Sequence, residues 1–347
     1  MRCKNKLFIL FLFPLFLWGD SSLVEFDRLM GKKNTSFDAL SFKEQAFLEK
    51  LKQHYEQKKE RIKAEALETK IPKVIHFIWL GPRPFPPTSV QNVRSWLAKH
   101  PDWKIKFWTD RSRFPPCEEM ECIDVEAFSF SFFGELFNQT ENYGEKSDLL
   151  RFEILYREGG VYVDHDASCL TSFDALHEGF DFYCGLEVPH PPVADRVLTC
   201  GNGLIGAKPS HPLIKEVIHL IAARWEEIAK RYRGNDGYSR TQRVMERTYL
   251  ALTLAIEKNL DRLSDCDIVL PAAYFFSKGK LAPLYSQHFF ANAWAQEKRK
   301  SVPKQWRKEI ASVEKMVKKI QKMVLLTTLC NTVALFFLIK KPRQFFR

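Results

Sequence analysis

Residues 147–166 read SDLLRFEILYREGGVYVDHD, and they carry the strongest indication of the fold class. Its first half places apolar side chains at helical spacing, and the pair Gly159-Gly160 predicts the end of that helix. Residues 161–163 are a short apolar run, which predicts a buried strand that ends in two aspartates. A strand that carries acids at its carboxyl end is typical of α/β folds, in which ligands bind at that end.

Asp164 and Asp166 lie two positions apart, so both side chains point the same way in an extended chain. Such a pair suits a hard cation such as Mg²⁺ or Mn²⁺, which keeps open positions for diphosphate oxygens. Alone it is weak evidence, because aspartates after strands are usually turn or capping residues. Asp148 and Arg151 strengthen it, because they share one face of the preceding helix, which the glycine pair folds back beside the strand. The alternative for these two residues is an ordinary surface ion pair.

Strand and helix patterns alternate along the chain. Strand-like runs lie at 74–79, 103–108, 161–163, 182–186 and 203–206, and helical patterns lie at 41–69, 90–99, 147–157, 213–231 and 243–258. This alternation predicts one α/β domain over residues 71–296, between a basic helical region at 23–70 and a basic C-terminal helix at 297–347. The chain has 347 residues, 45% of them hydrophobic, which is enough for a large core.

The pattern DxxR…GGxYxDxD of residues 148–166 resembles the DXD sugar-binding region of the yeast initiating α-mannosyltransferase family. It is also similar to the glucosyltransferase domain of the large clostridial toxins. The resemblance implies a GT-A-like fold, an α/β mixed sheet flanked by helices, with helical N- and C-terminal extensions. It further implies a metal-dependent, retaining hexosyltransferase that uses Mn²⁺ or Mg²⁺ and a UDP- or GDP-hexose donor. The catalytic residues would be Asp148, Arg151, Asp164 and Asp166.

Three further segments share the resemblance. Residues 75–81 (IHFIWLG) are similar to the first strand of these enzymes, where the tryptophan, here Trp79, stacks on the nucleotide base; a buried core aromatic is the alternative. Residues 201–206 (GNGLIG) resemble a segment whose asparagine contacts the transferred sugar. Residues 288–294 (HFFANAW) resemble the segment that closes over metal and diphosphate, although Ala293 replaces the usual serine. The predicted donor-binding residues are Trp79, Asp148, Arg151, Tyr162, Asn202 and Trp294, and the predicted metal ligands are Asp164, Asp166, His288 and Asn292.

The flanks hold most of the surplus in a formal net charge of +11, and each contains an apolar run. Residues 7–18 follow three basic residues and predict a signal peptide or short anchor at 1–22. Residues 323–339 lie between lysines and predict a transmembrane segment, with an amphipathic or core helix as the alternative. Basic flanks beside apolar runs indicate anionic lipid rather than nucleic acid. We therefore expect a membrane-associated chain, exported or in the secretory pathway, with a nucleotide-sugar donor and a glycan, glycolipid or protein acceptor.

Two other functions stay open. A haloacid-dehalogenase-type phosphatase also places D-x-D after an apolar strand, and Asp265 with Asp267 would be its acidic pair, but that family does not need the pattern of residues 148–162. A catalytically decayed, membrane-tethered binding protein on the same fold would account for Ala293. If the chain is a transferase, Asp181 and Glu187 are candidate carboxylates near the sugar.

Overall fold

The computed structural model describes residues 21–32, 37–63, 69–291 and 316. Met1–Ala295 form one compact unit, and Gln296–Arg347 form a second. Nearly all of the predicted signal peptide at 1–22, and all of the predicted transmembrane segment at 323–339, lie outside the described residues. Among the helices of the described part, none is long and apolar enough to cross a membrane.

A seven-stranded sheet forms the centre of the first unit, in the order β3-β2-β1-β4-β7-β6-β8. Only β7 runs against its neighbours β4 and β6, and the other neighbouring pairs are parallel. The predicted mixed sheet is confirmed. Its strands are β1 (Val74–Ile78), β2 (Lys104–Thr109), β3 (Glu121–Asp124), β4 (Gly160–Val163), β6 (Phe182–Leu186), β7 (Cys200–Ala207) and β8 (Asp267–Leu270). A separate pair joins β5 (Ala167–Cys169) to β9 (Ser286–His288).

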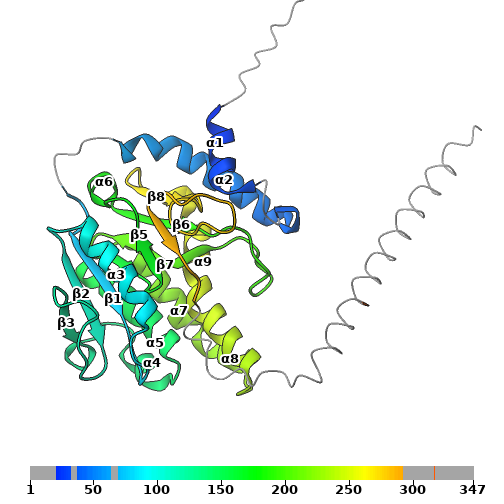
Figure 1. The fold of residues 1–347 in the computed structure, drawn as a ribbon. Helices are drawn as coiled ribbons and strands as arrows, with labels where there is room; N and C mark the ends of the chain where they lie inside the picture. Colours follow the sequence, from blue (N-terminus) through cyan, green and yellow to red (C-terminus); the bar gives the residue numbers. More distant parts are fainter. Residues whose placement is uncertain (1–20, 33–36, 64–68, 292–315, 317–347) are drawn as a thin grey trace, which may run out of the picture. The chain divides into compact units, whose positions relative to one another are not determined.

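Helices flank this sheet, as predicted, and α2 lies beside β8 (Figure 1). The apolar positions Phe47, Leu51 and Tyr55 of α2 are buried in the common core, so the basic N-terminal helix is a packing helix. The α-helices are α1 (Ser21–Leu29), α2 (Phe42–Lys58), α3 (Pro87–Lys99), α4 (Gly134–Gln139), α5 (Tyr143–Glu158), α6 (Asp174–Gly179), α7 (Pro212–Arg231), α8 (Gly237–Val244) and α9 (Leu250–Asn259). Short 3₁₀ turns are η2 (Phe37–Ala39), η3 (Lys59–Ile62), η4 (Val125–Ala127) and η6 (Leu260–Arg262).

The glycine pair between α5 and β4 makes the predicted turn. Gly159 and Gly160 have φ of 67° and 90°, a region that favours glycine. A Cβ on Gly160 would also lie 2.5 Å from the carbonyl oxygen of Val74, so a side chain cannot be accommodated there. The pair therefore lets α5 reverse directly into β4, which is buried along its whole length.

The helix predicted over residues 243–258 is interrupted. The segment η5 (Met245–Tyr249) is π-helical, and the amide of Leu250 donates to the carbonyl oxygen of Met245 five residues back. Hydrophobic periodicity could not reveal this turn, because residues 246–249 are polar or aromatic and each is fixed by a partner on another element. π turns occur frequently at functional sites.

Candidate metal and sugar-binding site

Three acid and imidazole side chains converge at the carboxyl end of β4. Asp164 follows β4 directly, and its amide donates to the carbonyl oxygen of Gly203 at 2.8 Å. The Nε2 atom of His288 lies 3.3 Å from Asp164 Oδ2 and 3.5 Å from Asp166 Oδ1. One ligand atom from each of these residues lies within 4.8 Å of the others, a spacing that could hold a metal ion. The structure thus brings the distant segment at 288 to the DXD pair.

Pairing between β5 and β9 places His288 there. Ala167 is the register partner of His288, and beyond it the amide of Phe289 donates to the carbonyl oxygen of Asp166 at 2.8 Å. The amide of Ala291 donates to Asp166 Oδ2 at 2.6 Å. The segment after β9 therefore lies over the second aspartate of the motif. The predicted Asn292 and Trp294, like Ala293, lie outside the described residues.

The imidazole of His288 has a defined proton arrangement. The amide of Phe290 donates to Nδ1 at 3.0 Å, so a neutral ring carries its proton on Nε2 and donates it toward Asp164. Burial acts to lower the pKa of His288, but the hydrogen bond to Asp164 and the charge of Asp166 outweigh burial and raise it. In this arrangement His288 donates to Asp164 and lies close to Asp166, and ligation of an ion through Nε2 would first require loss of that proton.

Glycines of β7 give these side chains their space. A Cβ on Gly203 would lie 2.7 Å from Asp164 Oδ2 and 2.9 Å from His288 Nε2, so only glycine fits there without displacing both groups. The ring of Phe276 lies where a Cβ of Gly201 would be, at 2.5 Å, and its centroid is 5.4 Å from that of His288. The glycines at 201 and 203 therefore admit the acid, the imidazole and the ring that supports it.

Asp148 and Arg151 form a buried ion pair beside Asp164. The guanidinium NH2 atom lies 2.8 Å from Asp148 Oδ1 and 3.5 Å from Asp164 Oδ1, and both side chains of the pair are less than a tenth exposed. The alternative of a surface ion pair is therefore wrong. Arg151 also donates to the carbonyl oxygen of Asn202, whose side-chain amide donates to Asp148 at 3.2 Å.

Burial and the neighbouring charges shift the pKa values of Asp148 and Asp164 in opposite directions. Burial raises the pKa of Asp148 to about 6, although Arg151 opposes the rise. Burial also acts to raise the pKa of Asp164, but Arg151 and His288 outweigh it and hold the pKa well below its usual value. The hydroxyl of Tyr162 donates to Asp164 at 2.5 Å, and its ring lies 4.0 Å from the Arg151 guanidinium carbon. Asp164 is thus the more strongly anionic of the two.

Trp79 ends the first strand, as predicted, and lies next to the motif. Its ring centroid is 4.8 Å from that of His165 and 5.5 Å from that of Phe85, and its Nε1 donates to the carbonyl oxygen of Arg83. Only 9% of the residue is exposed, so most of the ring is covered by its neighbours. Base stacking by Trp79 stays a prediction.

The two candidate carboxylates, Asp181 and Glu187, lie at opposite ends of β6. Glu187 follows the carboxyl end of β6, which runs parallel to β4, so it lies at the same edge of the sheet as Asp164. Asp181 precedes β6 at the opposite edge, where it pairs with Lys208 at 2.6 Å. The expectation that Asp181 lies near the sugar is wrong.

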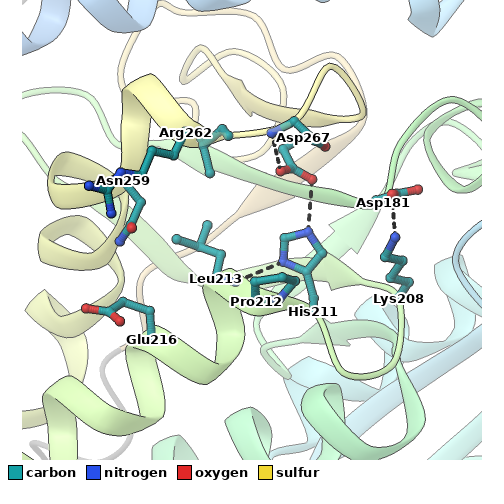
Figure 2. Close-up of a pocket in the computed structure, with 11 residues that line it drawn as sticks. Asp181, Lys208, His211, Pro212, Leu213, Glu216, Asn259, Arg262 and Asp267 are labelled. Atoms are coloured by element: carbon teal, nitrogen blue, oxygen red, sulfur yellow. Dashed lines mark hydrogen bonds and ion pairs between the residues drawn. The ribbon is translucent and has the colours of Figure 1, made fainter.

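Figure 2 shows that opposite edge, where a cavity of about 420 Å³ opens between α7 and β8. Two pairs of its polar groups bind each other: Lys208 binds Asp181, and His211 Nε2 lies 2.9 Å from Asp267 Oδ1. His211 is also the N-cap of α7, where its Nδ1 accepts from the amide of Leu213. Asp267 therefore fixes the N-cap histidine of α7.

Sequence patterns did not reveal two partners of the site. Thr248 donates to Asp148, and Tyr249 donates to Glu187 Oε1 at 2.8 Å. Both residues lie in η5, far from the motif in sequence, and neither belongs to a recognisable pattern. The sequence offered one indirect signal. Asp148 and Glu187 are acidic, and an acid that becomes buried requires a hydrogen-bond donor from elsewhere in the chain.

Comparison with known proteins identifies this region. Residues 86–182 match the family model described as a glycosyltransferase sugar-binding region containing a DXD motif. "Subversion of eukaryotic traffic protein A" of Legionella pneumophila is 32% identical over 164 residues, which cover 42% of this chain and 25% of that protein. "Inositol phosphoceramide mannosyltransferase 1" of Schizosaccharomyces pombe is 29% identical over 156 residues, which cover 44% of this chain and 43% of that protein. The matched part thus spans less than half of each relative.

Among solved structures, "PaToxG Glycosyltransferase" is similar with a TM-score of 0.42 and 20% identity, over 60% of this chain and 80% of that chain. The resemblance to DXD glycosyltransferases that residues 148–166 indicated is confirmed by the family match, which contains the whole of α5, β4 and the motif. Residues 86–182 are therefore similar to glycosyltransferase sugar-binding regions that contain a DXD motif.

Proposed function

We propose that this chain is a metal-dependent glycosyltransferase that transfers a hexose from a nucleotide sugar to a hydroxyl of a glycan, glycolipid or protein. The observation that carries the proposal is the group of Asp164, Asp166 and His288, whose ligand atoms lie within 4.8 Å of one another. Both aspartates belong to the matched DXD region, and His288 comes from outside it. A phosphatase would not need the buried Asp148–Arg151 pair, and the family match supports the transferase instead.

The residues fit a divalent ion. Two carboxylates with an imidazole between them offer the hard oxygen ligands that Mn²⁺ and Mg²⁺ prefer. An ion bound there would neutralise charge on the departing nucleoside diphosphate. Asp164 and Asp166 would hold it, with Arg151 and Tyr162 fixing the orientation of Asp164. His288 donates through Nε2 to Asp164 and lies 3.5 Å from Asp166 in the arrangement described.

On the sugar side, Asp148 and Asn202 are the groups we propose to contact the transferred hexose. Arg151 and Thr248 hold Asp148 from two directions, so its carboxylate is fixed before a sugar arrives. Trp79 and Trp294 would line the nucleotide end. The same proposal includes a UDP- or GDP-hexose as donor and retention of the configuration of the transferred sugar. It also includes attachment to a membrane through residues 323–339.

The proposed transferase function can be tested by measuring hydrolysis of nucleotide sugars by the full chain in detergent. A panel of UDP- and GDP-hexoses with Mn²⁺ would be compared between the natural sequence and the variants Asp164→Asn and Asp166→Asn. We expect one nucleotide to be released only with metal, and release to fall at least about 100-fold in both variants, since a group that stabilises the transition state is removed. Equal turnover in the variants would overturn the site, and turnover of aryl phosphates alone would identify a phosphatase.

A further inference from the structure

A second carboxylate lies beside the candidate metal group but is not part of it. Glu187 follows β6, is 8% exposed, and its amide donates to the carbonyl oxygen of Thr199 at 2.9 Å. It follows the carboxyl end of β6, and because β6 runs parallel to β4, it lies at the same end of the sheet as Asp164. Glu187 therefore lies at the site, on the far side of β7 from Asp164.

Within the described part of the chain, Glu187 accepts a hydrogen bond at one oxygen and meets only a longer ion-pair contact at the other. Tyr249 donates to Oε1 at 2.8 Å, whereas the Nζ atom of Lys278 lies 3.7 Å from Oε2, beyond hydrogen-bond distance. Lys278 also lies 4.0 Å from the ring centroid of Phe290, which packs against His288 at 4.5 Å. A fixed carboxylate whose second oxygen keeps acceptor capacity can receive a hydroxyl of a ligand.

Two consecutive residues of the π turn η5 donate to Asp148 and to Glu187. Thr248 donates to Asp148 and the next residue, Tyr249, donates to Glu187, so consecutive residues of η5 fix two acids. Asp148 lies beside Asn202 of β7, and Glu187 lies beside Thr199 just before the same strand. The two carboxylates thus bracket the start of β7, and the geometry of η5 sets the distance between them.

We propose that Glu187 is a further sugar-binding residue, which accepts a hydrogen bond from a hydroxyl of the transferred hexose opposite Asp148, and that Tyr249 positions it. This inference rests on the proposed transferase function. A site built to bind a hydroxyl rejects an analogue that lacks it, because the polar group is then left unpaired. Glu187 would therefore contribute to the choice among hexose epimers rather than to binding of the nucleotide.

The test compares Glu187→Gln and Tyr249→Phe with the natural full chain. Asp181→Asn is the matched control, since it makes a carboxylate-to-amide change at the other end of β6, away from the site. Each protein would be assayed for Mn²⁺-dependent hydrolysis of the preferred nucleotide hexose and its deoxy analogues, and for affinity for the nucleoside diphosphate alone. Thermal unfolding would check that each variant folds.

For Glu187→Gln we expect kcat/KM for the hexose donor to fall about 10- to 100-fold, the effect of losing a hydrogen bond to a charged group. Discrimination against one deoxy analogue should fall by a similar factor, while nucleotide affinity stays within about twofold. Tyr249→Phe should also lower the discrimination against the deoxy analogue, but by a smaller factor. This variant provides the same test if Glu187→Gln does not fold. Unchanged discrimination in folded variants would overturn the inference alone, whereas no nucleotide binding by the natural chain would overturn the proposed function and this inference with it.

Discussion

Replacement of Gly203 by alanine perturbs the candidate site without removing any functional group. A Cβ there would lie 2.7 Å from Asp164 Oδ2 and 2.9 Å from His288 Nε2. Carbon and oxygen approach to about 3.3 Å even in weak C–H···O contacts, so the Asp164 carboxylate must move by about half an ångström. Gly203 does not have a positive φ, so alanine brings no backbone strain. The whole effect of the change would come from the displaced carboxylate and imidazole.

The size of the effect follows from the tolerance of such sites. Catalytic groups must be held within about 0.5 Å, and a misplacement of about 1 Å can cost about 100-fold in rate. We therefore expect Gly203→Ala to lower Mn²⁺-dependent nucleotide-sugar hydrolysis by about 10- to 100-fold and to weaken Mn²⁺ binding. Overpacking of buried β7 should cost about 1–3 kcal/mol of unfolding free energy, which leaves the fold intact at assay temperature.

The assay measures turnover, Mn²⁺ affinity by electron paramagnetic resonance and thermal unfolding on the same samples. Gly237→Ala is the control, because no atom lies within 4 Å of a Cβ at this first residue of α8. It should match the natural chain in all three measurements. If Gly203→Ala also keeps Mn²⁺ affinity and turnover within twofold, the close approach of β7 to Asp164 has no functional role and the account of the site is wrong.

Three further predictions concern groups around the site and core. His288→Gln keeps an N–H donor and should retain more Mn²⁺ affinity than His288→Ala in calorimetric titration; equal losses would indicate ligation through Nε2 instead. Arg151→Met removes the cation beside the buried Asp148 and should lower the urea-derived unfolding free energy by about 3–5 kcal/mol, more than Arg151→Lys, which keeps the charge; equal losses would show that the charge of Arg151 does not stabilise the fold. Burial lowers the pKa of His76 and of His177 to about 3, so below pH 6.5 the unfolded chain binds protons that the folded chain excludes. Unfolding at pH 5 should therefore be easier than at pH 7 by about 2 kcal/mol for each histidine, and a stability that stays level between these pH values would argue against neutral buried rings.

Much of the fold could be predicted because its signals are local. The run at 182–186 became β6 with the same bounds, and the glycine pair at 159–160 ended α5 where expected. Short strands such as β5 and β9 could not be predicted, because three residues carry no periodicity and exist as strands only through each other. The predicted helix at 243–258 concealed the π turn because residues 246–249 are polar or aromatic, so they carry no hydrophobic period in which an extra residue could be recognised.

The site divides in the same way. Asp164, Asp166, Asp148 and Arg151 were found because they share one short stretch with fixed spacing. Their burial could not be inferred, since an i,i+3 pair on a helix has the same sequence whether it faces solvent or a strand. The choice between Asp181 and Glu187 needed the direction of β6, which the sequence of a short buried strand does not encode.

The proposed function depends above all on a metal site for the nucleotide-sugar diphosphate, formed by the acids after β4. Measuring whether nucleotide changes the affinity for Mn²⁺ is the sharpest test of that site. Calorimetric titration of the full chain with Mn²⁺, in the presence and absence of UDP or GDP, would be run beside Asp166→Asn. The account predicts that one nucleotide tightens Mn²⁺ binding by about 5- to 150-fold, and that Asp166→Asn removes this coupling. Independent binding of metal and both nucleotides, or undiminished coupling in the variant, would contradict it.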